Sequence, residues 1–107
     1  MTHFPERYKE LSTWMDKLGV AIPQTMKGFS ELHKASIAPG VLDSKTKELL
    51  ALGIAITVRC EGCIAFHVHD ALQAEASKEE IAETVSVAIL MGGGFMLWFM
   101  VLKPCKP

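Results

Sequence analysis

Residues 57–67 read Thr-Val-Arg-Cys-Glu-Gly-Cys-Ile-Ala-Phe-His, and the rest of the chain can be interpreted around them. Two cysteines, Cys60 and Cys63, are followed by His67 four residues further on. Successive residues of an α-helix are rotated by about 100°, so these three side chains would fall within an arc of about 60°. His69 would point to the opposite side. The spacing therefore predicts a helix that presents two thiols and an imidazole on one face.

The whole chain is short and apolar. It has 107 residues, of which 50% are hydrophobic, and a net charge of -1 from 11 basic and 12 acidic residues. We expect a single domain spanning residues 1–107, and so much apolar surface in so small a domain predicts that another subunit covers part of it. No cluster of basic residues stands out, which argues against nucleic-acid and anionic-membrane partners.

The start of the chain lacks the apolar region of a signal peptide. Three cysteines, two of them in a Cys-x-x-Cys pair, do not form the framework of a disulfide-stabilised secreted domain. In cytoplasmic proteins this spacing is typical of redox-active or metal-binding sites, so we expect a cytoplasmic location.

Apolar residues recur at helical spacing and no alternating strand pattern occurs, which predicts an all-α fold of about six helices. Caps, prolines and glycines mark the boundaries between them. The first expected helix spans residues 5–18, and the second runs from Pro23 to the break at Ala38-Pro39-Gly40. The third begins at Asp43 or Ser44 and includes the apolar run 49–58, and the fourth runs from Cys60 to about Ala76. The fifth runs from the Ser77–Glu80 capping box to the glycines at 92–94, and the last spans residues 95–102. The apolar run 49–58 predicts that the third helix is buried on most sides. In the second helix, helical spacing predicts an inner face of Met26, Phe29 and Leu32 or His33.

Residues 85–102 have a second interpretation. They form a stretch of 18 residues without a charge, which is the lower limit for a membrane span. Three consecutive glycines in the middle of the stretch would be costly in an isolated helix. A pair of buried helices at a subunit interface is therefore favoured over a membrane span.

The thiolate is the reactive form of cysteine, and two features favour it here. The start of a helix favours an anion at Cys60, whereas His67 lies one turn beyond Cys63 and could accept its proton. The two effects nominate different nucleophiles, and either cysteine could close a disulfide with the other. If the third and fourth helices form a hairpin, Glu48 faces His67, because both are equally far from the expected turn. A carboxylate there would orient the imidazole and complete a relay from Cys63 through His67 to Glu48.

Glu48, Cys60, Cys63 and His67, followed by the Met91–Gly94 run, resemble the motif of alkylhydroperoxidase D (AhpD) and its carboxymuconolactone decarboxylase-like relatives. The likeness covers about residues 40–100. It implies an AhpD-like helical domain that assembles as homotrimers or homohexamers. It also implies a thiol peroxidase or disulfide reductase that takes a hydroperoxide or disulfide substrate and a thiol or redox protein as reductant.

The resemblance further implies a role for each motif residue. Cys63 would attack the peroxide, Cys60 would resolve the product, and Glu48 and His67 would relay protons. Family members with peroxidase activity often carry a histidine between the cysteines, where this chain has Glu61-Gly62. General thiol redox activity is therefore more firmly implied than peroxidase activity.

Other interpretations of the same residues stay open. His67 and Glu48 could act as acid and base in decarboxylase-like or lactone chemistry, with the cysteines incidental. The cysteines and His67 could hold Zn²⁺ through three ligands in a non-catalytic binding or assembly module. The two cysteines could be inert core residues, and Glu48 a solvated residue of a first helical turn.

The remaining candidate residues carry weaker signals. His33 and His69 are expected to be structural or surface residues, and Cys105, in a tail of lysines and prolines, is expected to have no role in the site. Because no phosphate loop or dinucleotide fingerprint occurs in the sequence, we expect no nucleotide cofactor.

Overall fold

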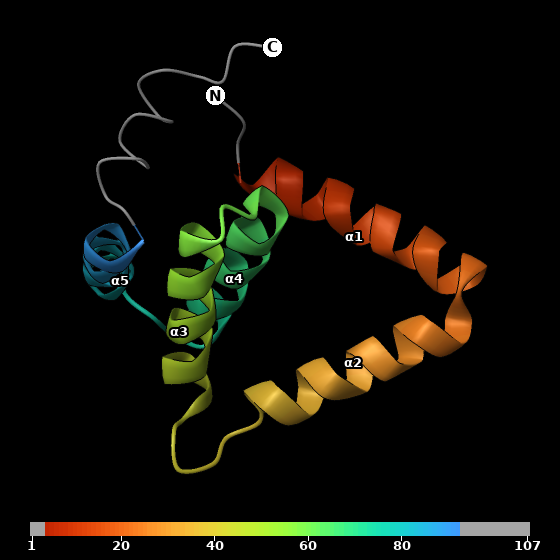
Figure 1. Cartoon of the computed structure of the whole chain (residues 1–107), viewed down its shortest axis with the longest axis horizontal. Helices are drawn as coiled ribbons and strands as arrows, with labels where there is room; N and C mark the ends of the chain where they lie inside the picture. The colour runs from red at the N-terminus through yellow and green to blue at the C-terminus, as the bar shows by residue number, and fades with distance from the viewer. Residues whose placement is uncertain (1–3, 93–107) are drawn as a thin grey trace.

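The computed structural model describes residues 4–92, which form five α-helices and no strand (Figure 1). The helices are α1 (Phe4–Ala21), α2 (Pro23–Ile37), α3 (Ser44–Thr57), α4 (Glu61–Gln73) and α5 (Lys78–Met91). The predicted all-α fold class is therefore confirmed. The last expected helix, residues 95–102, lies outside the described residues.

The core lies where α3 packs against both α4 and α5. It is built on Leu52, Ile56 and Ala88, with partly buried Ile64 and Val68 of α4 against it. Leu52 is the largest fully buried side chain in the described part. In α3, residues three or four apart face the core together, as the apolar spacing requires.

The other face of α3 is exposed, so the expectation that this helix is buried on most sides is wrong for the single chain. Ile54 is 62% exposed and Leu50 is 52% exposed. Together with Val87 and Met91 of α5 they line a groove of about 380 Å³. Within residues 4–92, only α4 and α5 pack closely on α3, and neither of them covers the side that carries Leu50 and Ile54.

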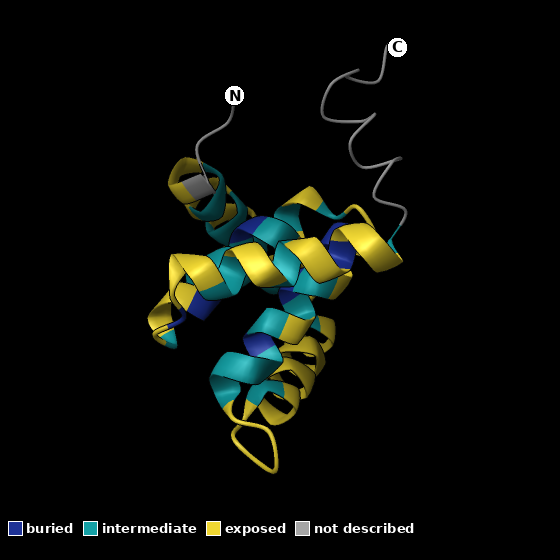
Figure 2. Ribbon diagram, turned by 90° about the vertical axis from the view of Figure 1, so that its left-hand side faces the viewer, coloured by how far each residue is buried: buried dark blue, intermediate teal, exposed yellow. Residues whose placement is uncertain are grey.

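Helices α1 and α2 form an arm that extends away from the core, which we call the α1–α2 arm (Figure 1). Helix α1 packs against α4, and α2 contacts α1 and, more lightly, α3. No residue from 5 to 37 is buried, whereas buried positions are distributed over α3, α4 and α5 (Figure 2). The arm is therefore attached to the core mainly through α1.

The turn between α3 and α4 is set by Arg59, which adopts a left-handed conformation with φ 61°. The Arg59 N–H donates to the Ile56 carbonyl at 3.1 Å, and the Cys60 N–H donates to the Ala55 carbonyl at 3.0 Å. These two bonds form the Schellman motif that ends many helices. Cys60 therefore precedes α4 as its N-cap instead of being its first helical residue, and its Sγ accepts a hydrogen bond from the Cys63 N–H at 3.2 Å.

The end of α4 repeats this arrangement three residues earlier than the sequence predicts. Glu75 has φ 67°, and Ala76 donates its N–H to the Ala71 carbonyl at 2.9 Å. Helix α4 consequently ends at Gln73 and not near Ala76. Neither left-handed residue is a glycine, so no residue type in the sequence indicates these two motifs.

Helix α1 continues to Ala21, past the expected end at residue 18. Gly19 is tolerated within the helix, and the Ile22 N–H still donates to the Leu18 carbonyl at 2.8 Å. The chain leaves the helix only before Pro23, which has no N–H to donate and disfavours a helical residue ahead of it.

The starts of α3 and α5 are capped as predicted. Asp43 Oδ1 accepts the Thr46 N–H at 2.7 Å, and Ser77 and Glu80 form a capping box. Hydrogen bonds from Thr46 lower the pKa of Asp43. The Ser77 N–H and then the Lys45 side chain, 2.9 Å away, lower the pKa of Glu80. The Lys45–Glu80 ion pair connects the first turns of α3 and α5.

Helix α5 ends at Met91 with Gly92 as its C-cap, as the glycine run predicts. A Cβ at this position would lie 2.8 Å from Thr57 Oγ1 and 3.1 Å from Thr57 Cα, so the close approach of α5 to the end of α3 requires glycine. None of the described helices combines the length and apolar character needed to cross a membrane. Of the segment 85–102, residues 93–102 lie outside the described part.

Candidate active site

The Cys-x-x-Cys pair lies at the start of α4 and is joined as a disulfide between Cys60 and Cys63, with Cα atoms 5.2 Å apart. Cys60 is half-buried and Cys63 is exposed. The interpretation of the two cysteines as core residues is therefore wrong. In this disulfide form neither sulfur is a thiolate that could bind Zn²⁺, so the alternative zinc site would require the reduced protein.

Glu48 of α3 faces His67 of α4 across the helical hairpin. Its Oε1 lies 2.8 Å from His67 Nδ1, and the residue is only 4% exposed. The contact expected from the hairpin is thus present, and the alternative of a solvated Glu48 is wrong. When Nδ1 carries the proton it donates to the carboxylate, which leaves Nε2 as the free proton acceptor of the ring.

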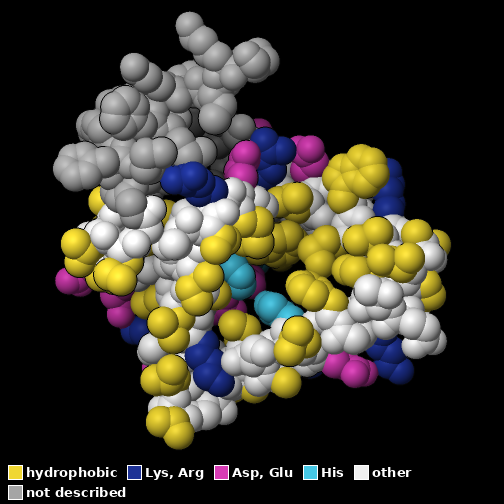
Figure 3. Space-filling model, in the orientation of Figure 1, with side chains coloured by type: hydrophobic (Ala, Val, Ile, Leu, Met, Phe, Trp, Pro, Cys, Tyr) yellow, Lys and Arg dark blue, Asp and Glu magenta, His cyan; other side chains and the backbone are white. Residues whose placement is uncertain are grey.

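The cysteines and His67 share a pocket of about 580 Å³ between the hairpin and the α1–α2 arm. Figure 3 shows histidine side chains at the edge of this hollow, among hydrophobic side chains. The remaining lining residues are Tyr8, Met15, Phe29, Ser30, His33, Lys34, Gly62, Phe66 and Asp70. The walls are thus mainly apolar, and Lys34 and Asp70 add one charge of each sign.

The contribution of the arm to this pocket was not foreseen from the sequence. Phe29 and His33 belong to the face of α2 that helical spacing had marked as an inner face. That pattern indicated which side of α2 is turned inward, but it could not indicate which part of the chain α2 would meet.

The two residues between the cysteines attach the arm to the site. Glu61 pairs with Arg7 of α1 at 2.9 Å. A Cβ on Gly62 would lie 3.3 Å from Leu11 Cδ1, so α1 packs directly on this turn. Glu61-Gly62 therefore has a packing function in this chain.

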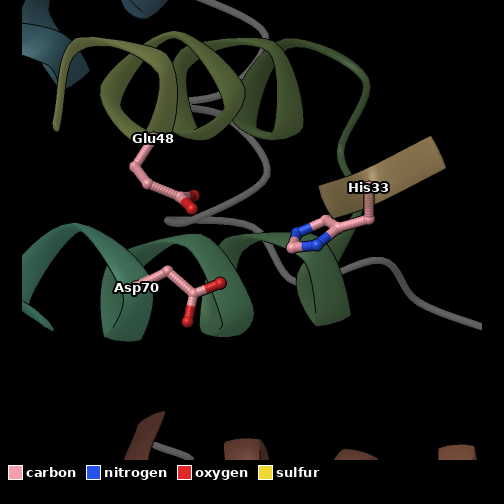
Figure 4. Close-up of side chains that lie close together, drawn as sticks. All are labelled: His33, Glu48 and Asp70. Atoms are coloured by element: carbon pink, nitrogen blue, oxygen red, sulfur yellow. The ribbon is translucent and has the colours of Figure 1, made fainter. Parts of the chain in front are cut away.

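Next to the Glu48–His67 pair lies a second group of ionisable side chains, His33, Glu48 and Asp70 (Figure 4). One nitrogen or oxygen from each residue lies within 4.8 Å of those of the other two. His69, which the sequence placed on the other side of α4, stacks on Tyr8 at 3.8 Å between ring centres, and its Nδ1 lies 3.1 Å from Asp70 Oδ1.

Comparisons with known proteins agree with this architecture. A family model described as the carboxymuconolactone decarboxylase family matches residues 23–98. An uncharacterized protein of Cupriavidus necator is 36% identical over 93 residues, which are 87% of this chain and 82% of that protein.

Two solved structures show the same likeness. A carboxymuconolactone decarboxylase family protein from Legionella pneumophila is 39% identical, with a TM-score of 0.82 over 92% of this chain and 88% of that one. A protein of the same family from Thermotoga maritima, described with a possible part in the antioxidative response, is 40% identical, with a TM-score of 0.61 over 64% of this chain and 71% of that one. The chain therefore belongs to the carboxymuconolactone decarboxylase family.

Proposed function

We propose that this protein is a thiol-dependent oxidoreductase that cycles Cys60 and Cys63 between dithiol and disulfide to reduce hydroperoxides or disulfides. The observation that carries the proposal is the 2.8 Å contact between His67 and the buried Glu48 in the pocket that also holds the cysteine pair. A proton acceptor in the same pocket as a cysteine pair that can form a disulfide is what a dithiol redox cycle needs.

In the proposed cycle Cys63 is the nucleophile. Its thiolate attacks one oxygen of the hydroperoxide, the O–O bond breaks, and the other oxygen leaves as an alcohol once it is protonated. Cys63 is then a sulfenic acid. The Cys60 thiolate attacks the Cys63 sulfur, the S–O bond breaks, and water is released as the disulfide forms. Two electrons from an external thiol or redox protein restore the dithiol.

The choice of Cys63 is supported by its exposure and by the position of Cys60. Cys60 is half-buried, and its Sγ accepts the Cys63 N–H at 3.2 Å in the N-cap geometry. The more accessible sulfur is the one a substrate in the pocket would meet first. The same helix start favours an anion at Cys60, which suits a sulfur that must attack Cys63 in the second step.

His67 and Glu48 form the proposed proton relay. His67 removes the Cys63 proton through Nε2 and later protonates the leaving oxygen, while the Nδ1–H stays on the Glu48 carboxylate. Glu48 acts by orienting the ring and by stabilising the charge that the ring acquires. Its burial in the hairpin keeps water from competing for that hydrogen bond.

The site supports both substrate classes. Tyr8, Met15, Phe29 and Phe66 give the pocket apolar walls, and its volume of about 580 Å³ has room for an organic hydroperoxide. The exposed Cys63 is also open to the disulfide of a protein partner. The possible antioxidative role given for the Thermotoga maritima relative agrees with either substrate.

Homotrimeric or homohexameric assembly in the cytoplasm is part of the proposal. The exposed groove of α3 and α5 and the arm's exposed Trp14, at 60%, and Leu32, at 65%, are apolar surface that further copies would cover. A reducing compartment supplies the thiols that the cycle consumes. Light scattering on the purified protein tests the assembly, and an Ile54→Arg variant is expected to reduce it to smaller species.

The cycle is tested by trapping its intermediate. In a Cys105→Ser background, Cys60→Ser should accumulate a sulfenic acid on Cys63 that dimedone labels one-to-one with added peroxide, as measured by mass spectrometry. Cys63→Ser should give no label and no turnover. If label appears on Cys60 instead, the two roles are reversed.

A Cys60→Ser/Cys63→Ser variant separates this proposal from acid–base chemistry by His67 and Glu48. The double variant is expected to lose all peroxide and disulfide reduction. Decarboxylase-like or lactone turnover by that variant would assign such a reaction to the His67–Glu48 pair, because these two residues can transfer protons but cannot supply the electrons that peroxide reduction consumes. One zinc ion per reduced chain, with thiols that resist alkylation, would indicate a binding module.

A further inference from the structure

We propose that His33, Glu48 and Asp70 form a binding site for one divalent transition-metal ion of the Zn²⁺ or Mn²⁺ type, distinct from the cysteine pair. The three residues come from α2, α3 and α4, and each points a donor atom into the same space (Figure 4). Those donor atoms all lie within 4.8 Å of one another. The proposed ion would use Glu48 together with the redox site.

The spacing suits an ion of this size. Bonds of about 2.1 Å place neighbouring ligands about 3 Å apart and opposite ligands about 4.2 Å apart around a metal. The donors therefore need to approach by only a small shift. His33 can supply it, because its side chain is exposed and its helix contains no buried residue.

Both carboxylates are already oriented by histidines. His67 Nδ1 holds Glu48 Oε1 at 2.8 Å, and His69 Nδ1 holds Asp70 Oδ1 at 3.1 Å. Among the described residues no hydrogen bond or ion pair engages the second oxygen of either side chain. Ligating carboxylates are typically held by a hydrogen bond through one oxygen while the other binds the ion. The two histidine contacts therefore hold both carboxylates in place and leave one oxygen of each for the ion.

The burial of Glu48 points the same way. The residue is 4% exposed, and a buried carboxylate is stable only when partners compensate its charge. His67 compensates part of it through Oε1, and a cation at the remaining oxygen would complete the compensation. One imidazole and two carboxylates match ions that accept mixed nitrogen and oxygen ligands. Three protein ligands leave positions for water or for a molecule in the pocket.

Metal binding would act on both the arm and the redox site. His33 belongs to α2, which contacts α3 only lightly, so an ion would fix α2 against the hairpin. It would also draw electron density from the carboxylate that serves His67. We therefore expect the ion to slow the thiol chemistry, in contrast to a metal that is required for it.

The test uses protein in which no thiol can bind the metal. A His3→Ala/Cys105→Ser background is kept in the Cys60–Cys63 disulfide form and titrated with Zn²⁺ by calorimetry and with Co²⁺ by visible absorption. One ion per chain is expected. His33→Ala and Asp70→Asn should each weaken binding at least tenfold, and Glu31→Gln, an exposed carboxylate on the same helix as His33, should leave it unchanged.

Two results would overturn the site. One is the absence of binding at metal-ion concentrations below millimolar. The other is an equal affinity for the ion in the His33→Ala variant, the Asp70→Asn variant and the background protein. Circular dichroism shows whether the variants are folded. Hydrogen exchange gives a second readout, since Zn²⁺ should slow exchange in α2 of the background protein and not in the His33→Ala variant. Because the oxidised protein does not turn over, neither result depends on the proposed redox function.

Discussion

Replacing Glu48 by glutamine removes the negative charge from the proposed proton relay and keeps the shape of the side chain. The amide retains the length of the side chain and an oxygen that can accept a hydrogen bond from the His67 Nδ1–H. In the wild-type protein, His67 Nδ1 lies 2.8 Å from Glu48 Oε1. Only the negative charge is removed. If the carboxylate serves to stabilise charge on the imidazole, as the redox proposal requires, the folded variant should react with peroxide more slowly than the wild type.

The size of the effect follows from the contact. A hydrogen bond to a charged group contributes about 1.5–3 kcal/mol, against about 0.5–1.5 kcal/mol for a neutral one, so glutamine forfeits about 1.4 kcal/mol. That difference corresponds to about a tenfold lower rate. Folding should change much less, because Glu48 is 4% exposed and its replacement removes the cost of burying a charge. We expect a change of no more than about 1 kcal/mol in the free energy of unfolding, of either sign.

The assay is the rate at which peroxide converts the reduced dithiol to the disulfide, with the rate of Cys63 alkylation at fixed pH as a second measure. Both are run with a metal chelator, so that the proposed ion at Glu48 has no influence. Glu83→Gln, an exposed glutamate on α5, is the matched control and should match the wild type. Glu48→Gln rates within twofold of the wild type would refute the role of the carboxylate.

The remaining predictions concern the turns and caps that position the site. Gly92→Ala should lower the stability by about 1–3 kcal/mol in urea unfolding, because its Cβ would lie 2.8 Å from Thr57 Oγ1; an unchanged midpoint would contradict the close approach. Glu75→Gly should raise stability by about 1 kcal/mol, because glycine adopts the left-handed conformation freely, and a loss would show that another contact of Glu75 matters more. The folded protein lowers the pKa of Asp43 from 3.8 and that of Glu80 from 4.5. The two carboxylates therefore stabilise the fold fully above pH 3.8 and 4.5, and this stabilisation is lost as the pH falls through their lowered pKa values. The melting temperature, measured from neutral to acid pH, should show that loss. An Asp43→Asn/Glu80→Gln variant should show a melting temperature that depends less on pH; an equal pH dependence in the variant and the wild type would contradict the role of these two caps.

Local sequence signals were sufficient for most of the helix starts and for the contact between Glu48 and His67, but not for the ends of α1 and α4. The capping box at Ser77, the cap at Asp43 and Pro23 each mark a helix start, and a short-range pattern of this kind needs no tertiary information. The Glu48–His67 contact was also within reach, because an antiparallel hairpin fixes which residues face each other once its turn is known.

Features that depend on contacts between distant segments could not be predicted in this way. The sequence marks an inner face on α2 but not its partner, so the place of His33 beside Glu48 and Asp70 was missed. The packing of α1 on Glu61-Gly62 was missed for the same reason. The left-handed Arg59 was missed because no glycine marked it. Each of these depends on tertiary packing or on a strained residue, which local propensity does not encode.

Arg59 connects the two parts of the candidate chemistry. Its left-handed conformation ends α3 and directs the next residue, Cys60, into the N-cap of α4, where its sulfur meets the Cys63 N–H. The same turn fixes the register of the hairpin and so sets Glu48 opposite His67. The cysteine pair and the Glu48–His67 contact are therefore positioned by a single backbone feature and not by two independent ones. A change in the length of this turn would displace both together, whereas a side-chain change at either pair can alter one and leave the other in place.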